Sequence, residues 1–431
     1  MANVIFTNKC NLSCPFCFAE ENNQISAKND FDLCDAWKLS NFLSGNLFKF
    51  CGGEPTLNPN LISTIEALLE NNMTISILTN GLWPDEFRKY IEDMDIKKSV
   101  RVIFLFNILT PEFYTKEQYE RLNRTLKIIN PLQATLGITI YNMDFEYDYL
   151  FDLCDTYNIG RIRWSICAPN INGEEYKLEK KFHHVAQRLY GFLKEAERKH
   201  IKTHRDCGYI PPCFFKDKQL VDFLLKKDTS FQCSSSAIDI DKGNSAWRCY
   251  GLYSIFRVNI KDFRNELELQ KYFNRRIKIL DNLLNYQECK TCDFLRSGCG
   301  MGCYAIRIKK AKQIKPDICI FPVDDEKEIL NCCPKKAGEI IIHTKNEQKY
   351  IITRNKVFEN PTKAMLMILS YADGKTTLRE IIDNVKEKHK DYSQAAFETT
   401  KDFKIMFEMD LITVNYDFGL ELTNRPLATN E

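Results

Sequence analysis

The sequence predicts an α/β protein: a partial (β/α)6 TIM barrel, then a cysteine-rich domain, then a small winged-helix-like α+β domain. Three observations lead to this prediction. Short apolar runs alternate with amphipathic segments as far as about residue 199. The 18 cysteines include three near the N-terminus and a dense group from Cys207 to Cys333, with none after it. Helix and strand patterns then return after His343. We therefore expect domains at residues 1–200, 201–338 and 339–431.

Six strands are expected in the first domain, and they read "VIFT", "NLFKFC", "TISILT", "VRVIFLFN", "QATLGITIY" and "RIRWSI". Amphipathic segments such as "LISTIEALLENN" separate them, and this alternation is typical of parallel βα units with right-handed connections. A complete eight-unit barrel usually takes about 250 residues, so a shorter domain favours six units. Such folds place their chemistry at the carboxyl ends of the strands.

Composition narrows the class of partner and compartment. The 431 residues carry 60 basic and 58 acidic side chains, so the net charge of +2 argues against a nucleic-acid-binding face. The start "MANVIFTN" lacks the pattern of a signal peptide, and "VRVIFLFNIL" is far shorter than the ~18 residues of a membrane span. We expect a cytoplasmic protein with no membrane partner, in which clustered cysteines hold metal or perform redox chemistry.

The segment "TNKCNLSCPFCFAE" directly follows the first expected strand and contains Cys10, Cys14 and Cys17. Soft thiolates suit zinc or iron–sulfur clusters, and both structural zinc and a ferredoxin-type cubane take four protein ligands. Three thiolates would instead leave one iron of a cubane open to an outside ligand. The alternatives are a zinc loop completed by Cys51, or reactive loop thiols.

This CxxxCxxC spacing, with the aromatic Phe16 before the last cysteine, resembles the signature of the radical S-adenosylmethionine (SAM) superfamily. The resemblance covers the first 200 residues. It implies a 4Fe–4S cluster whose open iron is chelated by the amino and carboxylate groups of SAM. In that family the cluster delivers one electron, the sulfonium bond breaks, and a 5′-deoxyadenosyl radical abstracts a substrate hydrogen.

A second element, "CGGEPTLNPN", follows the second expected strand and places four candidate cofactor-binding residues at the same edge: Gly52, Gly53, Glu54 and Pro55. Paired glycines let a backbone approach a ligand, and a carboxylate accepts hydrogen bonds from an ammonium group. In the radical SAM family a GGEP segment here binds the methionine amino group; the alternative is a plain turn.

Three further polar residues end later strands: Asn80 in "LTNG", Asn107 in "FLFN" and Arg163 in "RIRWS". In members of the family, polar residues near these places contact the ribose or the carboxylate of SAM. The alternative is that each side chain caps its strand or anchors a loop.

The second cysteine group resembles the SPASM extension of radical SAM enzymes, which carries two auxiliary iron–sulfur clusters. The match covers roughly residues 230–320, with one extra residue before Cys249 and another before Cys299. The resemblance assigns the first auxiliary cluster to Cys233, Cys249 and Cys303. It assigns the second to Cys289, Cys292, Cys299 and Cys319. The first set lacks a fourth ligand, which Cys213 or Cys207 would supply, and we prefer Cys213. Without either, that iron is open to substrate; a zinc ribbon is the alternative to both clusters.

The C-terminal segment "NPTKAMLMILSYADGKTTLREIIDNV" with "DFKIMFEMDLITV" resembles the peptide-chaperone fold known as the RiPP recognition element, where RiPPs are ribosomally made, modified peptides. We expect a hairpin in "KYIITRNKVFEN", a helix closed by Gly374, and a capping box formed by Thr377 and Glu380. In that family a precursor's leader peptide adds as an extra strand. The alternative is a domain cap without a ligand.

Together these resemblances imply a RiPP maturase that uses SAM and three 4Fe–4S clusters to modify a precursor peptide held by its leader. The product would be a thioether crosslink, a carbon–carbon crosslink or an oxidised residue, and a flavodoxin or ferredoxin would serve as reductant. An anaerobic sulfatase maturase is disfavoured, because Tyr250 stands where that family has an Asp after Cys249. Tetrapyrrole-modifying enzymes and a non-catalytic electron carrier are the remaining alternatives. No catalytic acid or base is assigned.

Overall fold

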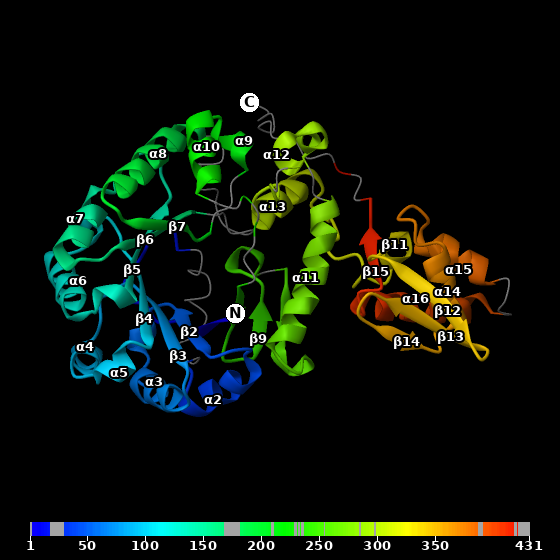
Figure 1. The fold of residues 1–431 in the computed structure, drawn as a ribbon, viewed down its shortest axis with the longest axis horizontal. Helices are drawn as coiled ribbons and strands as arrows, with labels where there is room; N and C mark the ends of the chain where they lie inside the picture. The colour runs from blue at the N-terminus through cyan, green and yellow to red at the C-terminus, as the bar shows by residue number, and fades with distance from the viewer. Residues whose placement is uncertain are drawn as a thin grey trace. The chain divides into compact units, whose positions relative to one another are not determined.

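A computed structural model describes residues 2–17, 30–167, 182–207, 211–227, 231, 233, 237–253, 255–283, 286–296, 299–386, 391–417 and 420. The chain divides into two compact units, coloured in chain order in Figure 1. The first unit comprises residues 1–270, 291–306 and 425–431, and the second comprises residues 271–290 and 307–424. No helix within these described ranges is long and apolar enough to cross a membrane.

A ten-stranded sheet forms the framework of the first unit. Its order is β10-β9-β8-β1-β2-β3-β4-β5-β6-β7, and all neighbours from β8 through β1 to β7 are parallel. The six expected strands are β1 Ala2–Thr7, β2 Leu47–Gly52, β3 Thr74–Thr79, β4 Val102–Asn107, β5 Ala134–Ile140 and β6 Arg161–Ile166. The predicted partial barrel is therefore confirmed.

Four strands of this sheet were not predicted from the sequence, namely β7 Lys202–Arg205, β8 Ile238–Ile240, β9 Ser245–Trp247 and β10 Arg257–Asn259. Strands of three or four residues are too short to show a period, and β7 is polar throughout. They extend the sheet at both edges, with β9 antiparallel to both β8 and β10.

Helices cover the outer side of this curved sheet (Figure 1). They are α2 Leu33–Phe42, α3 Leu61–Glu70, α4 Asp85–Glu92, α5 Ile96–Ser99, α6 Lys116–Ile128, α7 Asp148–Tyr157 and α8 Phe182–Arg198. In α3 the apolar residues Leu61, Ile65 and Leu68 recur at helical spacing and are buried. Because the helices bury their apolar faces against the sheet, the carboxyl ends of the strands are left as a rim for loops.

The described residues between β7 and residue 314 form five further α-helices. In the first unit lie α9 Pro212–Phe215, α10 Lys218–Lys226 and α12 Asp293–Arg296, whereas α11 Glu266–Leu283 and α13 Tyr304–Ile314 have residues in both units. The sequence from about Thr203 to Lys336 was expected to be rich in loops. Its described residues contain many short elements, but the 18-residue helix α11 and the 11-residue helix α13 were not expected.

After residue 314, the described residues of the second unit form two small antiparallel sheets and three α-helices. The strands are β11 Cys333–Lys336 paired with β15 Ile412–Asn415, and β12 Ile340–Lys345, β13 Gln348–Thr353 and β14 Val357–Glu359 in that order. The helices are α14 Lys363–Ser370, α15 Leu378–Lys386 and α16 Tyr392–Glu408. Their shared core includes the fully buried side chains Ile368, Leu378, Ile382, Phe403 and Met406.

Two of the three local predictions for this unit are confirmed. The hairpin is β13–β14, and the capping box forms, since Thr377 N donates to Glu380 Oε2 at 2.7 Å and Glu380 N donates to Thr377 Oγ1 at 3.2 Å. The helix closed by Gly374 is wrong, because α14 ends at Ser370 with Tyr371 as its cap. Gly374, with φ +78°, instead lies in the turn that follows.

Candidate functional site

The three-cysteine loop leaves the sheet at the carboxyl end of β1. Cys10 is exposed, Cys14 and Cys17 are half-buried, and Cys17 N donates to Cys14 O at 3.1 Å, which tightens the loop. Removal from water raises the pKa of Cys14 to about 12, and the charges of Cys17 and Cys10 add to this rise. Although Cys10 as a whole residue is exposed, its thiol is partly removed from water, which raises its pKa, and the charges of Glu54 and Cys17 add to this rise. The three thiols therefore lie close enough to act on one another's ionisation.

The glycine pair at the end of β2 allows two backbones to touch. A Cβ atom on Gly52 would lie 2.2 Å from Thr7 O, and one on Gly53 would lie 2.1 Å from Lys9 O. Gly53 N donates to Thr7 O at 2.9 Å and Glu54 N donates to Lys9 O at 2.7 Å. Glycine is required here because any side chain would push β2 away from the segment that leads into the cysteine loop.

Glu54 is fully buried, and its carboxylate accepts hydrogen bonds from neighbouring backbone and side-chain groups. Oε1 accepts from Thr56 N at 3.2 Å, Thr56 Oγ1 at 2.8 Å and Thr79 Oγ1 at 2.8 Å, while Oε2 accepts from Asn80 N at 2.7 Å. Burial raises the pKa of Glu54, and these donors oppose the rise. The side chain thus ties the ends of β2 and β3 together, and the adjoining Pro55 opens a short 3-10 helix.

Asn80 connects the end of β3 to the cysteine loop. Its Nδ2 donates to Asn11 Oδ1 at 2.8 Å and lies 3.9 Å from Cys10 Sγ, while its Oδ1 accepts from Leu82 N at 2.9 Å. Asn11 Nδ2 completes the contact by donating to Leu82 O at 2.8 Å. Asn11 was not singled out in the sequence, although its position next to Cys10 was a usable signal.

Asn107 and Arg163 meet across the strand between them. The Arg163 guanidinium donates to Asn107 Oδ1 and, at 2.8 Å, to Asp206 Oδ2. Gly137 on β5 makes this possible, because a Cβ there would lie 2.9 Å from Arg163 Nε. The structure therefore brings together two residues that the sequence placed on separate strands, and it adds Asp206.

Phe16 packs on Tyr141, with ring centroids 5.1 Å apart, and Tyr141 follows β5. The two rings, with Phe113 and Tyr149, line a hollow of about 100 Å³ at the ends of β4 and β5. Tyr141 was missed as a site residue, although it ends the predicted strand "QATLGITIY".

A buried carboxyl group lies where β8 joins β1. Asp239 accepts from Asn3 Nδ2 at 2.8 Å, and burial raises its pKa to about 7. Its charge acts on Cys51 and on Tyr250, and Cys17 also acts on Tyr250. The sequence offered no signal for Asp239, because β8 was too short to predict.

Beyond the barrel strands, three other cysteines of the first unit lie near enough to Cys249 for their charges to act on its thiol. Removal from water raises the pKa of the Cys249 thiol, and the charges of Cys303, Cys233 and Cys207 raise it further. Cys213 lies on α9 and is exposed. The expected ligand set, Cys233, Cys249 and Cys303 with Cys213 or Cys207, stays a prediction.

The other auxiliary cysteines fall on both units: Cys292 and Cys299 on the first, Cys289 and Cys319 on the second. Their grouping stays a prediction. Within the second unit the charge of Cys319 acts on the buried Cys332, and Cys333 Sγ donates to Lys375 O at 3.2 Å. Across the part of the chain that the structure describes, no group of three or more His, Cys, Asp or Glu side chains is gathered as tightly as metal ligands are.

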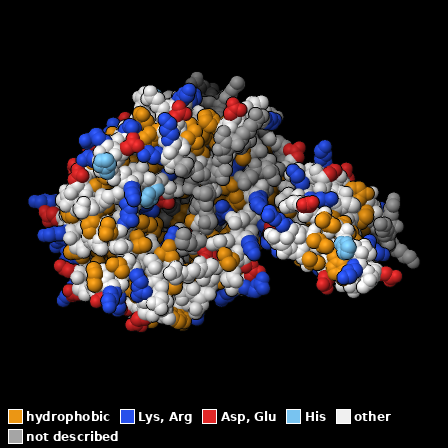
Figure 2. Space-filling view, in the orientation of Figure 1, with side chains coloured by type: hydrophobic (Ala, Val, Ile, Leu, Met, Phe, Trp, Pro, Cys, Tyr) orange, Lys and Arg blue, Asp and Glu red, His pale blue; other side chains and the backbone are white. Residues whose placement is uncertain are grey.

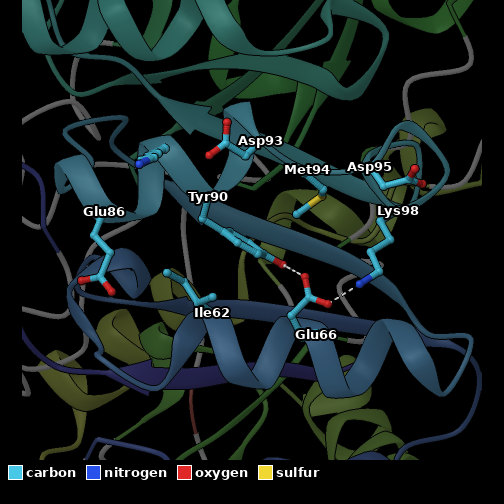
Figure 3. A pocket seen from close by; sticks show the side chains of 9 residues that line it. Ile62, Glu66, Glu86, Tyr90, Asp93, Met94, Asp95 and Lys98 are labelled. Atoms are coloured by element: carbon cyan, nitrogen blue, oxygen red, sulfur yellow. Dashed lines mark hydrogen bonds and ion pairs between the residues drawn. The ribbon is translucent and has the colours of Figure 1, made fainter.

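A separate hollow on the helical layer does not contain any of the predicted site residues (Figure 3). It is lined by side chains around α3, α4 and α5, where Tyr90 OH donates to Glu66 Oε1 at 2.7 Å and Lys98 pairs with the same carboxylate. These contacts join the helices to one another. The hollow contains no residue from the carboxyl ends of the strands.

Comparison with known proteins agrees with this geometry. Residues 4–135 match the family model described as "Radical SAM superfamily". The chain is 25% identical to "Probable GTP 3',8-cyclase" of Methanocaldococcus jannaschii over 51% of this chain and 87% of that protein. It is 30% identical to "S-adenosylmethionine-dependent nucleotide dehydratase" of Selenomonas ruminantium, over 40% of this chain and 58% of that protein. The chain thus spans little more than half of the second relative.

Two solved structures share the fold. "Streptococcus suis SuiB bound to precursor peptide SuiA" aligns with a TM-score of 0.52 and 15% identity, covering 72% of each chain. "Native anSMEcpe with bound AdoMet and Kp18Cys peptide" aligns with a TM-score of 0.51 and 17% identity, covering 70% of this chain and 88% of that one. At these identities the likeness shows the fold alone.

Residues 4–135 of the first unit therefore resemble the radical SAM superfamily, whose members are enzymes that use SAM and a 4Fe–4S cluster. The residues present fit that group: three soft thiols share one loop, and the glycine pair keeps side chains out of the backbone beside it. The SPASM and RiPP recognition resemblances remain predictions.

Proposed function

We propose that this protein is a radical SAM maturase of a ribosomally made precursor peptide. The observation that carries the proposal is the rim at the ends of β1 to β3. There Thr7 and Lys9, which lead into the cysteine loop, accept from Gly53 N and Glu54 N, and Asn80 donates to Asn11 within the loop. The expected reaction removes a hydrogen from the peptide and leads to a thioether or carbon–carbon crosslink or a related oxidation.

In this proposal Cys10, Cys14 and Cys17 hold the cluster, and the rim holds SAM. When both are bound, the cluster and SAM would supply a 5′-deoxyadenosyl radical. The backbone carbonyl groups of Gly52 and Gly53 would accept from the methionine amino group, since the N–H groups of Gly53 and Glu54 already donate to Thr7 O and Lys9 O. Since the Glu54 carboxylate already accepts four hydrogen bonds, its part is to position that backbone.

The remaining rim residues orient the other end of the nucleotide. Arg163, held by Asn107 and Asp206, presents a fixed guanidinium, which suits a carboxylate or a ribose hydroxyl. Phe16 and Tyr141 offer aromatic faces on which an adenine ring stacks.

The second unit offers a place for a peptide. Figure 2 shows hydrophobic side chains on its visible surface, and the exposed ones on the outer strands include Ile341 at 55% and Val357 at 59%. A groove of about 810 Å³ runs beside this sheet, lined by Ile340, Phe358 and Leu411 among others. Since β12 and β14 are the outer strands of the three-stranded sheet, a leader peptide can add to either edge.

The two auxiliary clusters would be held by the SPASM-like cysteines. Cys233, Cys249 and Cys303 form the first set, with Cys213 or Cys207 as a fourth ligand, and Cys289, Cys292, Cys299 and Cys319 form the second. The auxiliary clusters would take up the electron left on the product. A flavodoxin or ferredoxin would reduce the cluster held by Cys10, Cys14 and Cys17.

A second candidate substrate is a purine nucleotide, because the sequence relatives are named as a GTP 3′,8-cyclase and a nucleotide dehydratase. This alternative makes no use of the groove in the second unit. It also predicts that a nucleotide, and no peptide, stimulates SAM cleavage.

The test uses the full chain, reconstituted without oxygen, with SAM and dithionite. Short open reading frames next to the gene supply candidate peptides, and GTP supplies the competing substrate. We expect one peptide to increase 5′-deoxyadenosine formation and to lose hydrogen mass, and GTP to do neither. A stimulated turnover with GTP alone would transfer the assignment to nucleotide chemistry.

A further inference from the structure

We propose that Asp30 is a positioning residue for the cysteine loop, and that its ion pair with Lys9 balances the charge beside Cys10. The inference rests on the proposed function in one respect, since it takes Cys10, Cys14 and Cys17 to hold the cluster. Neither Asp30 nor Lys9 was singled out in the sequence.

Two asparagines in the "TLNPN" part of the glycine motif fix the residue that follows Asp30. Asn58 Nδ2 donates to Phe31 O at 3.0 Å and to Phe6 O at 2.9 Å. Asn60 Nδ2 donates to the same Phe31 oxygen at 3.1 Å. Phe31 N donates to Phe6 O at 3.1 Å, and the two rings stack with their centroids 5.8 Å apart. Because Asn58 and Phe31 are buried, these contacts hold Asp30 beside the carboxyl end of β1.

The Asp30 carboxylate binds the two residues through which β1 enters the cysteine loop. Its Oδ1 accepts from Thr7 Oγ1 at 2.6 Å, and its Oδ2 accepts from Lys9 Nζ at 2.6 Å. Lys9 N donates to Thr7 Oγ1 at 3.1 Å, so this hydroxyl is both a donor and an acceptor. The backbone carbonyls of the same two residues accept from Gly53 N and Glu54 N. The entry to the loop is therefore bonded both to the glycine segment and to Asp30.

The ion pair places a balanced charge next to the first thiol. Lys9 directly precedes Cys10 in the chain. The Lys9 side chain is 42% exposed and the Asp30 side chain 18%, and a pair this exposed contributes little to stability. Its effect is expected on the cluster, because net charge helps to set the reduction potential of an iron–sulfur cluster. A positive charge favours the reduced form, which carries one more electron, so an unpaired Lys9 ammonium group would raise the potential.

A second lysine near Asp30 has a carboxylate of its own. Lys242 Nζ donates to the backbone oxygen of Asp30 at 2.6 Å and pairs with Asp35 at 3.5 Å. Lys242 thus supports the Asp30 backbone from the turn that follows β8, and it leaves the Asp30 side chain to Thr7 and Lys9.

The positioning role is tested on the metal-free full chain by hydrogen exchange. Peptic fragments that contain residues 7–10 are compared between Asp30→Ala and the matched control Asp155→Ala. Asp155 lies on α7 and forms an equally short pair with Lys199, at 2.6 Å. We expect faster exchange of these fragments in Asp30→Ala alone. Exchange equal to that of the parent would overturn the positioning role.

The charge role is tested by a redox titration of the reconstituted full chain without oxygen, followed by electron paramagnetic resonance. The signal that is lost in Cys14→Ala identifies the cluster of the loop. We expect Asp30→Asn, which keeps an oxygen to accept from Thr7, to shift the potential of this cluster to less negative values. Lys9→Met should shift it to more negative values. The variant with both substitutions should return close to the parent, and Asp155→Asn should not shift it.

Disturbance of the loop without a charge effect would give a different pattern. Both single variants would then shift the potential in the same direction, and the double variant would depart from the parent at least as far as either. That pattern, or an unchanged potential in Asp30→Asn, would overturn the charge role, as would a parent without the loop's signal. Circular dichroism confirms folding, and Lys9→Met changes a half-exposed side chain that the fold does not need.

No peptide or nucleotide enters either measurement, so the two proposals fail separately. A chain that shows the opposite shifts of Asp30→Asn and Lys9→Met but modifies no peptide would contradict the maturase proposal alone. A chain that modifies a peptide but shows neither shift would contradict the role of Asp30 alone.

Discussion

The rim formed by β1, β2 and β3 and the cysteine segments between residues 207 and 303 both lie in the first unit, but they are held in different ways. At the rim, strand ends are joined by buried hydrogen bonds to Glu54 and Asn80 and by backbone contacts at two glycines. Most of the later cysteines, namely Cys207, Cys233, Cys249, Cys299 and Cys303, lie outside helices and strands. The comparison indicates that the fold itself builds the rim; if the proposed auxiliary clusters are present, the later segments would depend on them for part of their support.

The largest expected effect comes from the rim's thiols. Cys14→Ala should abolish 5′-deoxyadenosine formation down to the level of a control without protein, because two thiolates cannot hold the cluster. Since the rim is held by other bonds, circular dichroism and the unfolding temperature should stay close to those of the parent. Loss of the fold together with activity would contradict the difference drawn between the two regions.

Gly53→Ala should disturb the rim itself. The added Cβ would meet Lys9 O at 2.1 Å, so we expect a loss of about 3 kcal/mol in the free energy of unfolding, with weaker SAM binding. Denaturant titration and equilibrium dialysis measure both. Gly160→Ala is the matched control, because nothing lies within 4 Å of its added Cβ and its stability should not fall.

Iron removal should separate the two regions directly. In the metal-free protein we expect amide hydrogen exchange to rise around residues 233, 249 and 299–303 and to change little in β1 to β6. Mass spectrometry of peptic fragments provides the measurement. Equal loosening of the sheet strands would show that the barrel also depends on its metal.

Glu54→Gln should have a smaller effect. In this variant the amide NH2 group would face one of the donors from which the carboxylate now accepts a hydrogen bond. One buried donor without an acceptor costs about 2 kcal/mol. Glu70→Gln, at the exposed end of α3, is the control and should be neutral. Thermal unfolding of both variants distinguishes a positioning role from an ordinary surface carboxylate.

Asp239 should give the smallest effect, and one that depends on pH. Its pKa in the folded state is about 7, above the ordinary value of 3.8, so the folded state holds the proton more tightly than the unfolded chain. Stability therefore falls as pH rises between these two values and is level above about pH 7. Asp239→Asn should be more stable than the parent at about pH 8, with a smaller difference at about pH 5.

The titratable neighbours of Asp239 do not reverse this sign. Its charge acts on the thiols and phenol of Cys51, Cys249 and Tyr250, and burial raises the pKa of each, so they stay neutral in this range. A stability difference that stays constant between about pH 5 and pH 8, measured on the metal-free protein by thermal unfolding, would show that Asp239 is ionised in the folded state throughout this range.

Much of the fold was predictable because its signals are local. The period of "LISTIEALLENN" gave α3, and the strand residues flanking Cys10 and Gly52 placed both motifs at one edge of the sheet. The capping box of Thr377 was likewise visible in four residues. Strands β7 to β10 were missed because they are too short to carry a period.

Side-chain partnerships in the site depend on distant contacts, which a single sequence does not display. Arg163 reaches Asn107 only because Gly137 lies between them, and Asp239 meets Asn3 through a parallel pairing between strands 236 residues apart.

The most direct test of the central claim is to ask whether SAM binds to an iron of the Cys10–Cys17 cluster. Electron–nuclear double resonance on the reduced full chain, with SAM labelled isotopically in its amino and carboxylate groups, measures that bond. We predict magnetic coupling from both groups to the cluster, lost in Cys14→Ala. The absence of coupling in a chain whose loop holds a closed zinc site would contradict the account.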